Sequence, residues 1–310
     1  MKLIQIADCC ICCGSPQLAR SPAILMPFVA QRALGFAPIE ITQDWGMRDL
    51  KQGTSYMPCH SLQCQACGAL FLDIRFTEMQ MASLYHGYRD TTYNAQRDFH
   101  EPGYAATIAG DYRHRHVYLD RLETWLAPHL PACPTVLDWG GGDGTNTPFL
   151  GKGTIHIHDI SGVTPVAGAT AAPPDTSDVP YDLIVCAQVL EHVPAPLDLL
   201  KDILPRVAPG TRLYVEIPHE ALLREHPDRL DLAPRKHHWH EHINFLTEPA
   251  MRALFDRLGL SVLASHRTGF DNGFRKGEVM GFLLTSRAKP TPSRSSGSIP
   301  VKGHRPRLHI

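Results

Sequence analysis

The 310-residue sequence lacks an excess of charge of either sign: its 30 Lys and Arg residues and 31 Asp and Glu residues give a net charge of −1. Such a balance excludes a broad electrostatic field directed at nucleic acid or at a membrane surface. A long hydrophobic run is also missing, because residues 23–37 contain Gln31 and Arg32 and are too short to span a bilayer. We therefore expect no membrane association and no nucleic-acid partner.

A signal peptide is missing too, since Asp8 and the first cysteines follow a very short apolar start. The expected location is the cytoplasm, where thiols stay reduced. Nine cysteines in such a protein indicate metal binding or free thiols rather than disulfides. Most of them gather in two places near the start, at Cys9, Cys10, Cys12, Cys13, Cys59, Cys64 and Cys67.

Two Cys-x-x-Cys-Gly segments predict a structural zinc site. Each ends in Cys-Gly, which favours Cys10, Cys13, Cys64 and Cys67 as the four ligands. Four thiolates form the tetrahedral site that zinc prefers, with no open position for chemistry. Cys9 and Cys12 form an overlapping pair, and Cys59 lies nearby, so the ligand choice stays open. The alternative is a set of buried or redox-active thiols without metal.

The most informative stretch is VLDWGGGDGTNTPFL, residues 136–150. Its apolar start is typical of a buried strand, and Asp138 stands where that strand ends. Four glycines follow within five positions, and glycine is the residue that allows positive φ or a close backbone approach. A ligand at this turn would meet backbone N–H groups and the start of the next helix.

This stretch resembles motif I of the class I S-adenosylmethionine (SAM)-dependent methyltransferases. Three further elements follow in that family's order. Residues 155–157 form a strand that leads to Asp159, and residues 181–200, YDLIVCAQVLEHVPAPLDLL, resemble the fourth strand and its helix. Residues 208–218 resemble the fifth strand. The resemblance implies an α/β fold with a Rossmann-like, seven-stranded sheet, and SAM as cofactor.

The resemblance also assigns cofactor-binding residues. Asp138 would lie near the methionine amino group of SAM, with Gly140 and Gly142 in the turn. Asp159 would accept hydrogen bonds from the ribose hydroxyls, as acids at this place do in nucleotide-binding folds. Gln188 and Leu190, at the end of the fourth strand, would flank the cofactor.

The cysteine-rich start resembles the zinc-binding domain that precedes the catalytic domain in some sugar C-methyltransferases. There, too, the second Cys-x-x-Cys-Gly leads into a strand, which residues 68–72 fit. This similarity implies a small-molecule acceptor, with a nucleotide-linked sugar as one candidate. The additional C-terminal domain of those enzymes has no counterpart here. The oligomeric state is not readable from the sequence.

Two histidine segments supply candidates for acid–base work. His192 belongs to the LEHV signature and could be a base or could orient its loop. The segment KHHWHEHINF, residues 236–245, resembles one that lines the acceptor side of the pocket in related enzymes, and gives His240, Glu241 and His242. Histidine titrates near neutral pH, which suits proton transfer. The alternative is a loop whose histidines satisfy buried backbone groups.

The chain organisation follows from these motifs. We expect a zinc-ribbon-like module in residues 1–75 and a linker or lid segment in residues 76–104 that begins with a helix, 76–88. The methyltransferase domain would span 105–285, and the acid-free residues 286–310 would form a disordered basic tail.

Within the domain, we expect helices at 105–130, 196–207 and 248–258, the last capped by Thr247, and a short helix after the glycine turn. Residues 162–180 would hold the third strand in irregular form. Two strands at 260–266 and 279–285 would close the sheet as an antiparallel hairpin.

Three other functions are alternatives to methyl transfer to a small molecule. A dinucleotide-binding enzyme wants G-x-G-x-x-G, but position 145 is Thr145. A nucleic-acid methyltransferase calls for a basic face or an N/D-P-P-Y motif, and AQVLEHVP has neither. A SAM-binding or zinc-dependent interaction protein without turnover stays open, because no single catalytic residue is decisive.

Overall fold

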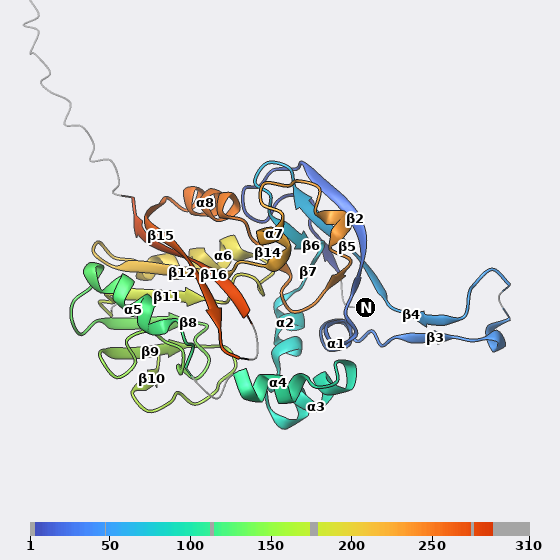
Figure 1. Cartoon of the computed structure of the whole chain (residues 1–310), viewed down its shortest axis with the longest axis horizontal. Coiled ribbons are helices and arrows are strands. Elements are labelled where there is room, and N and C mark those ends of the chain that lie inside the picture. Colours follow the sequence, from blue (N-terminus) through green and yellow to red (C-terminus); the bar gives the residue numbers. More distant parts are fainter. Residues whose placement is uncertain (1–3, 47, 112–114, 174–178, 274–275, 288–310) are drawn as a thin grey trace, which may run out of the picture.

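The computed structural model describes residues 4–46, 48–111, 115–173, 179–273 and 276–287. Nearly all of the expected basic tail, residues 288–310, lies outside this part of the chain. Figure 1 shows a large sheet on one side, a smaller sheet packed beside it, and a β-hairpin that projects from the smaller sheet.

The large sheet has seven strands in the order β10-β9-β8-β11-β12-β16-β15. Neighbours from β10 to β12 are parallel, whereas β16 runs antiparallel to both β12 and β15. In chain order these strands are β8 (Thr135–Trp139), β9 (Thr154–His158), β10 (Ala169–Ala171), β11 (Leu183–Ala187), β12 (Arg212–Pro218), β15 (Leu260–Asp271) and β16 (Lys276–Ser286). This order is that of a doubly wound sheet closed by an antiparallel hairpin, so the predicted fold class is confirmed.

Alternate residues of the large sheet enter two different cores, because successive strand side chains point to opposite faces. Leu137 and Ile184 pack on the face covered by α6 (Pro196–Ile203) and α8 (Glu248–Arg257). Their neighbours on the other face pack against α5 (Leu119–Leu126). The domain is therefore a three-layer α/β/α sandwich.

The smaller sheet has five strands in the order β13-β2-β5-β6-β14. They are β2 (Leu18–Leu25), β5 (Met57–Cys64), β6 (Leu70–Leu72), β13 (His238–Trp239) and β14 (Asn244–Phe245). Both edge strands come from the predicted histidine segment, so residues 1–75 do not build this sheet alone. The buried Trp239 and Phe245 pack there with Leu25 and Leu70.

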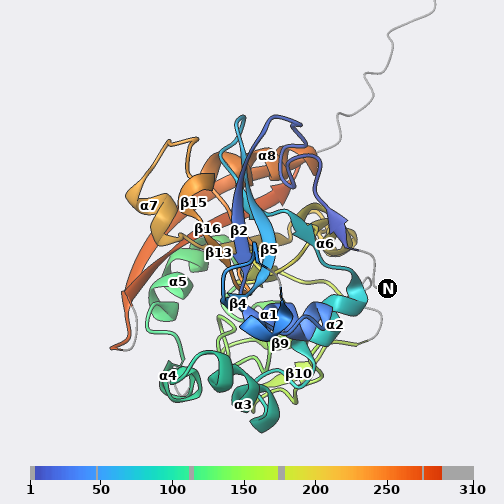
Figure 2. The same ribbon diagram turned by 90° about the vertical axis from the view of Figure 1, so that its right-hand side faces the viewer.

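Helices from the start of the chain and from the expected linker lie below the smaller sheet in both views (Figures 1 and 2). They are α1 (Pro27–Val29), α2 (Glu78–Tyr85), α3 (Thr91–His100) and α4 (Tyr104–Asp111). Phe28, Leu84 and Tyr93 bury their side chains in the core of the smaller sheet. The predicted linker is thus largely helical and packed against the module.

The remaining elements are short. They are the pair β1 (Gln5–Ile6) and β7 (Ile74–Arg75), the projecting hairpin β3 (Ile39–Ile41) and β4 (Gly53–Ser55), helix α7 (Ala221–Glu225), 3-10 turns at Gln43–Trp45, Ala127–His129, Leu204–Arg206 and Ala233–Arg235, and a π-helical turn at Ala30–Leu34.

Several sequence expectations are confirmed element by element. The strands at 155–157, 260–266 and 279–285 are present, the last two being longer than expected. Helix α8 begins after Thr247, whose side chain accepts a hydrogen bond from the Ala250 N–H. The irregular third strand is the three-residue β10.

The short helix expected after the glycine turn is wrong, because residues 140–153 form turns only. The segment Thr145–Asn146–Thr147–Pro148 is poor in helix formers. Phe149 has a φ of 63°, and its N–H donates to the Glu123 carboxylate at 2.7 Å. This loop is held by side chains rather than by a helical ladder.

The single helix expected at 105–130 is also wrong, since α4 ends at Asp111 and α5 begins at Leu119. Between them, Arg115 donates to the carbonyl oxygens of Thr145 and Thr147 at 3.0 and 2.8 Å. The His116 N–H donates to Asn146 Oδ1 at 2.9 Å. These hydrogen bonds hold Arg115 and His116 against the glycine loop in a non-helical conformation.

Candidate active site

The glycine loop lies at the carboxyl end of β8, at the edge where ligands bind in open α/β sheets. Gly140 has a φ of 86°, and a Cβ placed on it would lie 2.5 Å from the Val189 side chain. Only glycine fits both constraints. The close approach places the loop in direct contact with the turn after β11, which carries the LEHV signature.

Asp138 lies near the end of β8, and Asp159 directly follows the neighbouring strand β9. The Gly142 N–H donates to Asp159 Oδ2 at 2.8 Å. Asp138 is 5% exposed, and the Thr147 hydroxyl donates to its Oδ2 at 2.5 Å. Burial, reinforced by the charges of Asp159 and Glu216, raises the pKa of Asp138 to about 7 even though Thr147 lowers it. No cationic side chain among the described residues pairs with Asp138, so its carboxylate can accept a ligand cation.

Glu216 on β12 is a buried acid that the sequence reasoning missed. Its carboxylate accepts hydrogen bonds from Tyr118, Tyr214 and Gln188 at 2.7, 2.6 and 3.0 Å. Burial raises its pKa above the usual value despite these donors. Its position inside the strand pattern VEIP was the available signal, since an acid in a buried strand needs partners.

Gln188 and Leu190 occupy the turn after β11 as expected. Gln188 has a φ of 58°, and its amide points toward Glu216. The Leu190 side chain is wholly buried in the core with Cys186, and its carbonyl accepts from the Asn244 amide at 2.8 Å. Any contact between Leu190 and a cofactor would therefore involve its backbone.

The structure brings His192 and His242 together, although they are 50 residues apart in the sequence. Their ring centroids lie 4.7 Å apart at an interplanar angle of 87°. His192 Nδ1 lies 2.9 Å from the Tyr85 hydroxyl and 3.1 Å from the Glu241 carbonyl oxygen. Burial, reinforced by His242, lowers the pKa of His192 to about 3, so this ring is neutral.

His242 has the opposite electrostatic environment. Its Nδ1 lies 2.6 Å from a Glu220 carboxylate oxygen. Burial works to lower the pKa of His242, but Glu220 and Glu191 raise it above the usual value. One neutral imidazole and one readily protonated imidazole therefore share this site.

Glu191 lies beneath the two rings and was named in the sequence only as part of LEHV. It is 1% exposed, and neither carboxylate oxygen has a hydrogen-bond partner among the described residues. Burial raises its pKa to about 7, although the nearby His242 opposes the shift.

Glu241 and His240 face helix α3. Glu241 is 8% exposed and accepts from the Tyr93 hydroxyl and the Arg97 guanidinium. Burial works to raise the pKa of Glu241, but Arg97 and Tyr93 hold it below the usual value. His240 contacts Glu101 through Nε2 and Arg97 through Nδ1. Of the two, only Glu241 touches the pair of rings, through its backbone carbonyl.

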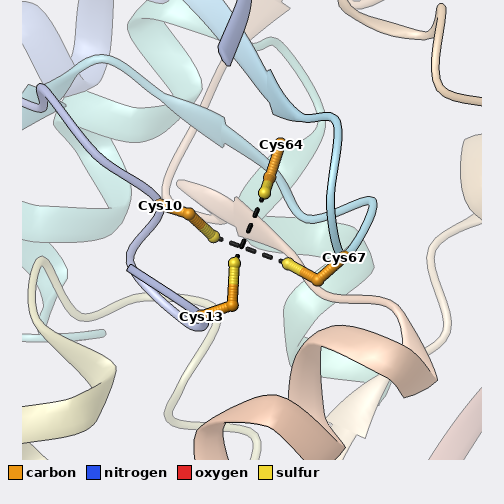
Figure 3. Close-up of side chains that lie close together, drawn as sticks. All are labelled: Cys10, Cys13, Cys64 and Cys67. Carbon is orange, nitrogen blue, oxygen red and sulfur yellow. Dashed lines mark hydrogen bonds between the residues drawn. The ribbon is translucent and has the colours of Figure 1, made fainter. Parts of the chain in front are cut away.

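The four cysteines favoured by the sequence form one cluster (Figure 3). Cys10 and Cys67 Sγ atoms lie 3.5 Å apart, as do those of Cys13 and Cys64, and all four lie within 4.8 Å of one another. A tetrahedral zinc with bonds of 2.3 Å would separate its thiolates by about 3.8 Å. The donor set and its spacing therefore fit zinc.

The two halves of the cluster have the same backbone geometry. The N–H of Gly14 donates to the carbonyl of Cys10, and that of Gly68 to that of Cys64, both at 2.9 Å. Both glycines have positive φ, 78° and 77°. Cys9, Cys12 and Cys59 do not belong to the cluster.

The sheet order, the glycine loop and the acids at the ends of β8 and β9 define a cofactor-binding α/β domain. A family model described as "Methyltransferase domain" matches residues 111–265, half of the chain. The chain belongs to this methyltransferase family and is an enzyme of that class.

Solved structures with matching folds share little sequence with this chain. They include a 1,6-didemethyltoxoflavin-N1-methyltransferase from Burkholderia thailandensis, 18% identical, covering 62% of this chain and 86% of that one, with a TM-score of 0.43.

A SAM-dependent methyltransferase from Methanosarcina mazei is 14% identical, with 53% of this chain and 98% of that chain covered and a TM-score of 0.40. A magnesium protoporphyrin IX methyltransferase from Synechocystis PCC 6803 is 18% identical, with 64% of this chain and 97% of that chain covered and a TM-score of 0.38. No curated protein matches the chain. Among the described residues, no helix has the length and apolar character needed to cross a membrane.

Proposed function

We propose that the chain transfers a methyl group from SAM to a small-molecule acceptor in the cytoplasm. The observation that carries this proposal is the glycine loop of β8, flanked by Asp138 and Asp159. Asp138 offers a carboxylate to the amino group of SAM, and Asp159 offers one to its ribose. The N–H groups of Gly140, Gly142 and Gly144 hold the loop itself in shape, because they donate to His158, Asp159 and Gly141.

For methyl transfer, the protein mainly has to position the cofactor and the acceptor. The sulfonium of SAM is already activated, so the main task is to hold the methyl carbon in line with the acceptor atom. A base assists where the acceptor must lose a proton. His192, on the turn that contacts the glycine loop, and His242, from the connection between β13 and β14, supply imidazoles for that role, while Glu241 fixes His192 through its carbonyl.

Cofactor binding is tested by isothermal titration with SAM and its demethylated product. Asp159→Ala should weaken both ligands at least about tenfold, because the ribose loses a charge-assisted hydrogen bond. Asp198→Ala is the matched control, since Asp198 is an exposed acid paired with Lys201 on α6. Failure of the folded, zinc-loaded wild type to bind either ligand would refute methyl transfer and favour a non-catalytic interaction protein.

We further propose that Cys10, Cys13, Cys64 and Cys67 hold one structural zinc ion. The cluster joins the first turn of the chain to the β5–β6 turn. It also touches the methyltransferase domain, because the Thr247 hydroxyl donates to the Cys67 carbonyl at 2.6 Å. Metal analysis should give about one zinc per chain that Cys64→Ser removes, whereas Cys133→Ser, at an exposed cysteine outside the cluster, should retain it.

The proposed acceptor class is a nucleotide-linked sugar, on the similarity of the cysteine module alone. A panel of acceptors with labelled SAM tests it. Transfer to nucleotide-linked sugars above other hydroxyl, amine and carbon acceptors supports the class, and transfer to a different acceptor refutes it while leaving methyl transfer in place.

A further inference from the structure

A second group of metal-ligating side chains lies apart from the cysteines, at the turn after β11. Glu191 and His192 come from this turn, and His242 comes from the connection between β13 and β14. Their candidate ligand atoms all lie within 4.8 Å of one another. We call these three residues the histidine–glutamate cluster.

Glu191 is the part of the cluster that most needs a partner. It is almost fully buried, and both of its oxygens lack a hydrogen-bond partner among the described residues. The His192 Nε2 atom lies 3.8 Å from Glu191 Oε1, which is too far for a hydrogen bond. A buried carboxylate without hydrogen bonds is costly, and a bound cation would remove that cost.

Both imidazoles are oriented as metal ligands usually are. Each has its Nδ1 beside an acceptor: the Glu241 carbonyl for His192, and the Glu220 carboxylate for His242. An Nδ1–H that donates to such a group leaves the lone pair of Nε2 free for a metal. Tyr85 adds a second contact to the Nδ1 of His192. The outer contacts that fix a metal-binding ring are therefore present for both residues.

The cluster has an open side. The His192 and His242 side chains are 22% and 37% exposed, whereas that of Glu191 is 1% exposed beneath them. Two imidazoles and one carboxylate leave further coordination positions for water or for a ligand oxygen. Val189 of the same turn lies against Gly140, so the turn that carries Glu191 and His192 borders the glycine loop.

We propose that Glu191, His192 and His242 bind one divalent transition-metal cation, with Glu220 positioning His242. Its open positions would take an oxygen of the acceptor, so the favoured acceptors carry a hydroxyl or carbonyl oxygen at or beside the methylated atom. With the cation bound, the two rings would act as its ligands and not as bases. This role rests on the proposed methyl transfer, whereas the binding of the cation does not.

The test loads the full-length protein with zinc at the cysteines and then titrates it with Co²⁺ alone. We expect a second metal equivalent whose absorption lacks thiolate-to-cobalt charge transfer, because its ligands are nitrogen and oxygen. Folded wild-type protein that takes up no second cation at micromolar Co²⁺, or only one with thiolate bands, would overturn the proposal. This arm needs no variant and so does not depend on the folding of one.

Variants then assign the ligands. Glu191→Gln and His242→Asn should each abolish the second equivalent and keep the cysteine-bound zinc. Glu220→Gln should weaken Co²⁺ binding by about 10–100-fold, the usual effect of losing an outer partner. His129→Asn, at an exposed histidine far along the chain from the cluster, is the control and should bind as the wild type does. Unchanged Co²⁺ binding in folded Glu191→Gln would overturn the assignment.

The experiment distinguishes failure of the metal-site proposal from failure of the methyl-transfer proposal. SAM binding is measured on the same sample, with and without Co²⁺. Binding of SAM without a second metal would refute the metal site and leave the methyltransferase proposal standing. Binding of a second metal without binding of SAM would support the metal site and refute the methyltransferase proposal.

Discussion

The charge state of Asp138 should control cofactor binding. Burial raises its pKa to about 7, and only its ionised form attracts the amino group of SAM. As pH rises through about 7 the ionised fraction grows, so the affinity for SAM should rise roughly tenfold between pH 6 and pH 7.5. Titration calorimetry across this range measures the effect.

The control for this pH dependence is Asp138→Asn, which keeps the size of the side chain and cannot ionise. It should bind SAM weakly and with a much flatter pH profile. An equally steep profile in Asp138→Asn would assign the titration to another group, such as the amino group of SAM itself.

Gly140 should tolerate no side chain. A Cβ there would meet Val189 at 2.5 Å, in addition to the strain of a φ of 86°. Gly151 offers a matched comparison, because its φ is 79° and nothing lies within 4 Å of its Cβ position.

Gly151→Ala should therefore lower the free energy of unfolding by about 1–2 kcal/mol through backbone strain alone. Gly140→Ala should lower the free energy of unfolding by about 1–3 kcal/mol more than Gly151→Ala does, because of the clash with Val189. It should also weaken SAM binding. Denaturant unfolding and calorimetry measure both quantities. Equal losses in the two variants would show that the contact with Val189 relaxes at no cost.

At the scale of elements, helix α3 holds the predicted acceptor segment in place through Arg97. Its guanidinium pairs with Glu241 and Glu101 and contacts His240. Arg97→Ala would leave Glu241 buried and without its cation, which should lower the free energy of unfolding by about 3–5 kcal/mol.

Arg252→Ala is the comparison for this loss, since Arg252 forms an exposed pair with Glu248. Its cost should stay below about 1 kcal/mol. Similar small losses in both variants, measured by denaturant unfolding, would mean that Glu241 is solvated once Arg97 is gone.

Local patterns predicted elements well where one signal dominated. Thr247 followed by Glu248 and Pro249 correctly marked the start of α8, and the apolar residues before Asp138 correctly marked β8. The helix expected at 105–130 failed because Arg115 and His116 form hydrogen bonds with the glycine loop, which local propensity does not register. The short helix after that loop failed because Glu123 binds the N–H of Phe149 from another element.

At the scale of the whole molecule, the cysteine cluster and the large sheet share one core. Cys10, Cys64 and Cys67 are buried in the same cluster as Leu254 and Phe255 of α8. The module and the methyltransferase domain should therefore unfold together rather than as two independent units.

Removal of zinc by a chelator should thus lower the single melting temperature of the whole chain, and Cys64→Ser should reproduce the shift. Differential scanning calorimetry distinguishes this from independent units. Two transitions, of which only the smaller one responds to the chelator, would show that the shared core does not couple the two parts.

The sequence by itself determined the fold class, through its resemblance to a known family, and the glycine loop, its two acids and the two Cys-x-x-Cys-Gly segments, because these depend on local spacing along the chain. Only the tertiary structure decided which histidines meet. His192 follows a strand of the large sheet, and His242 lies between two strands of the smaller one. His240 turns instead toward α3, and the buried Glu191 carboxylate has no hydrogen-bond partner in the described part of the chain. Such contacts depend on how distant segments pack, and residue spacing does not encode that packing in any readable form.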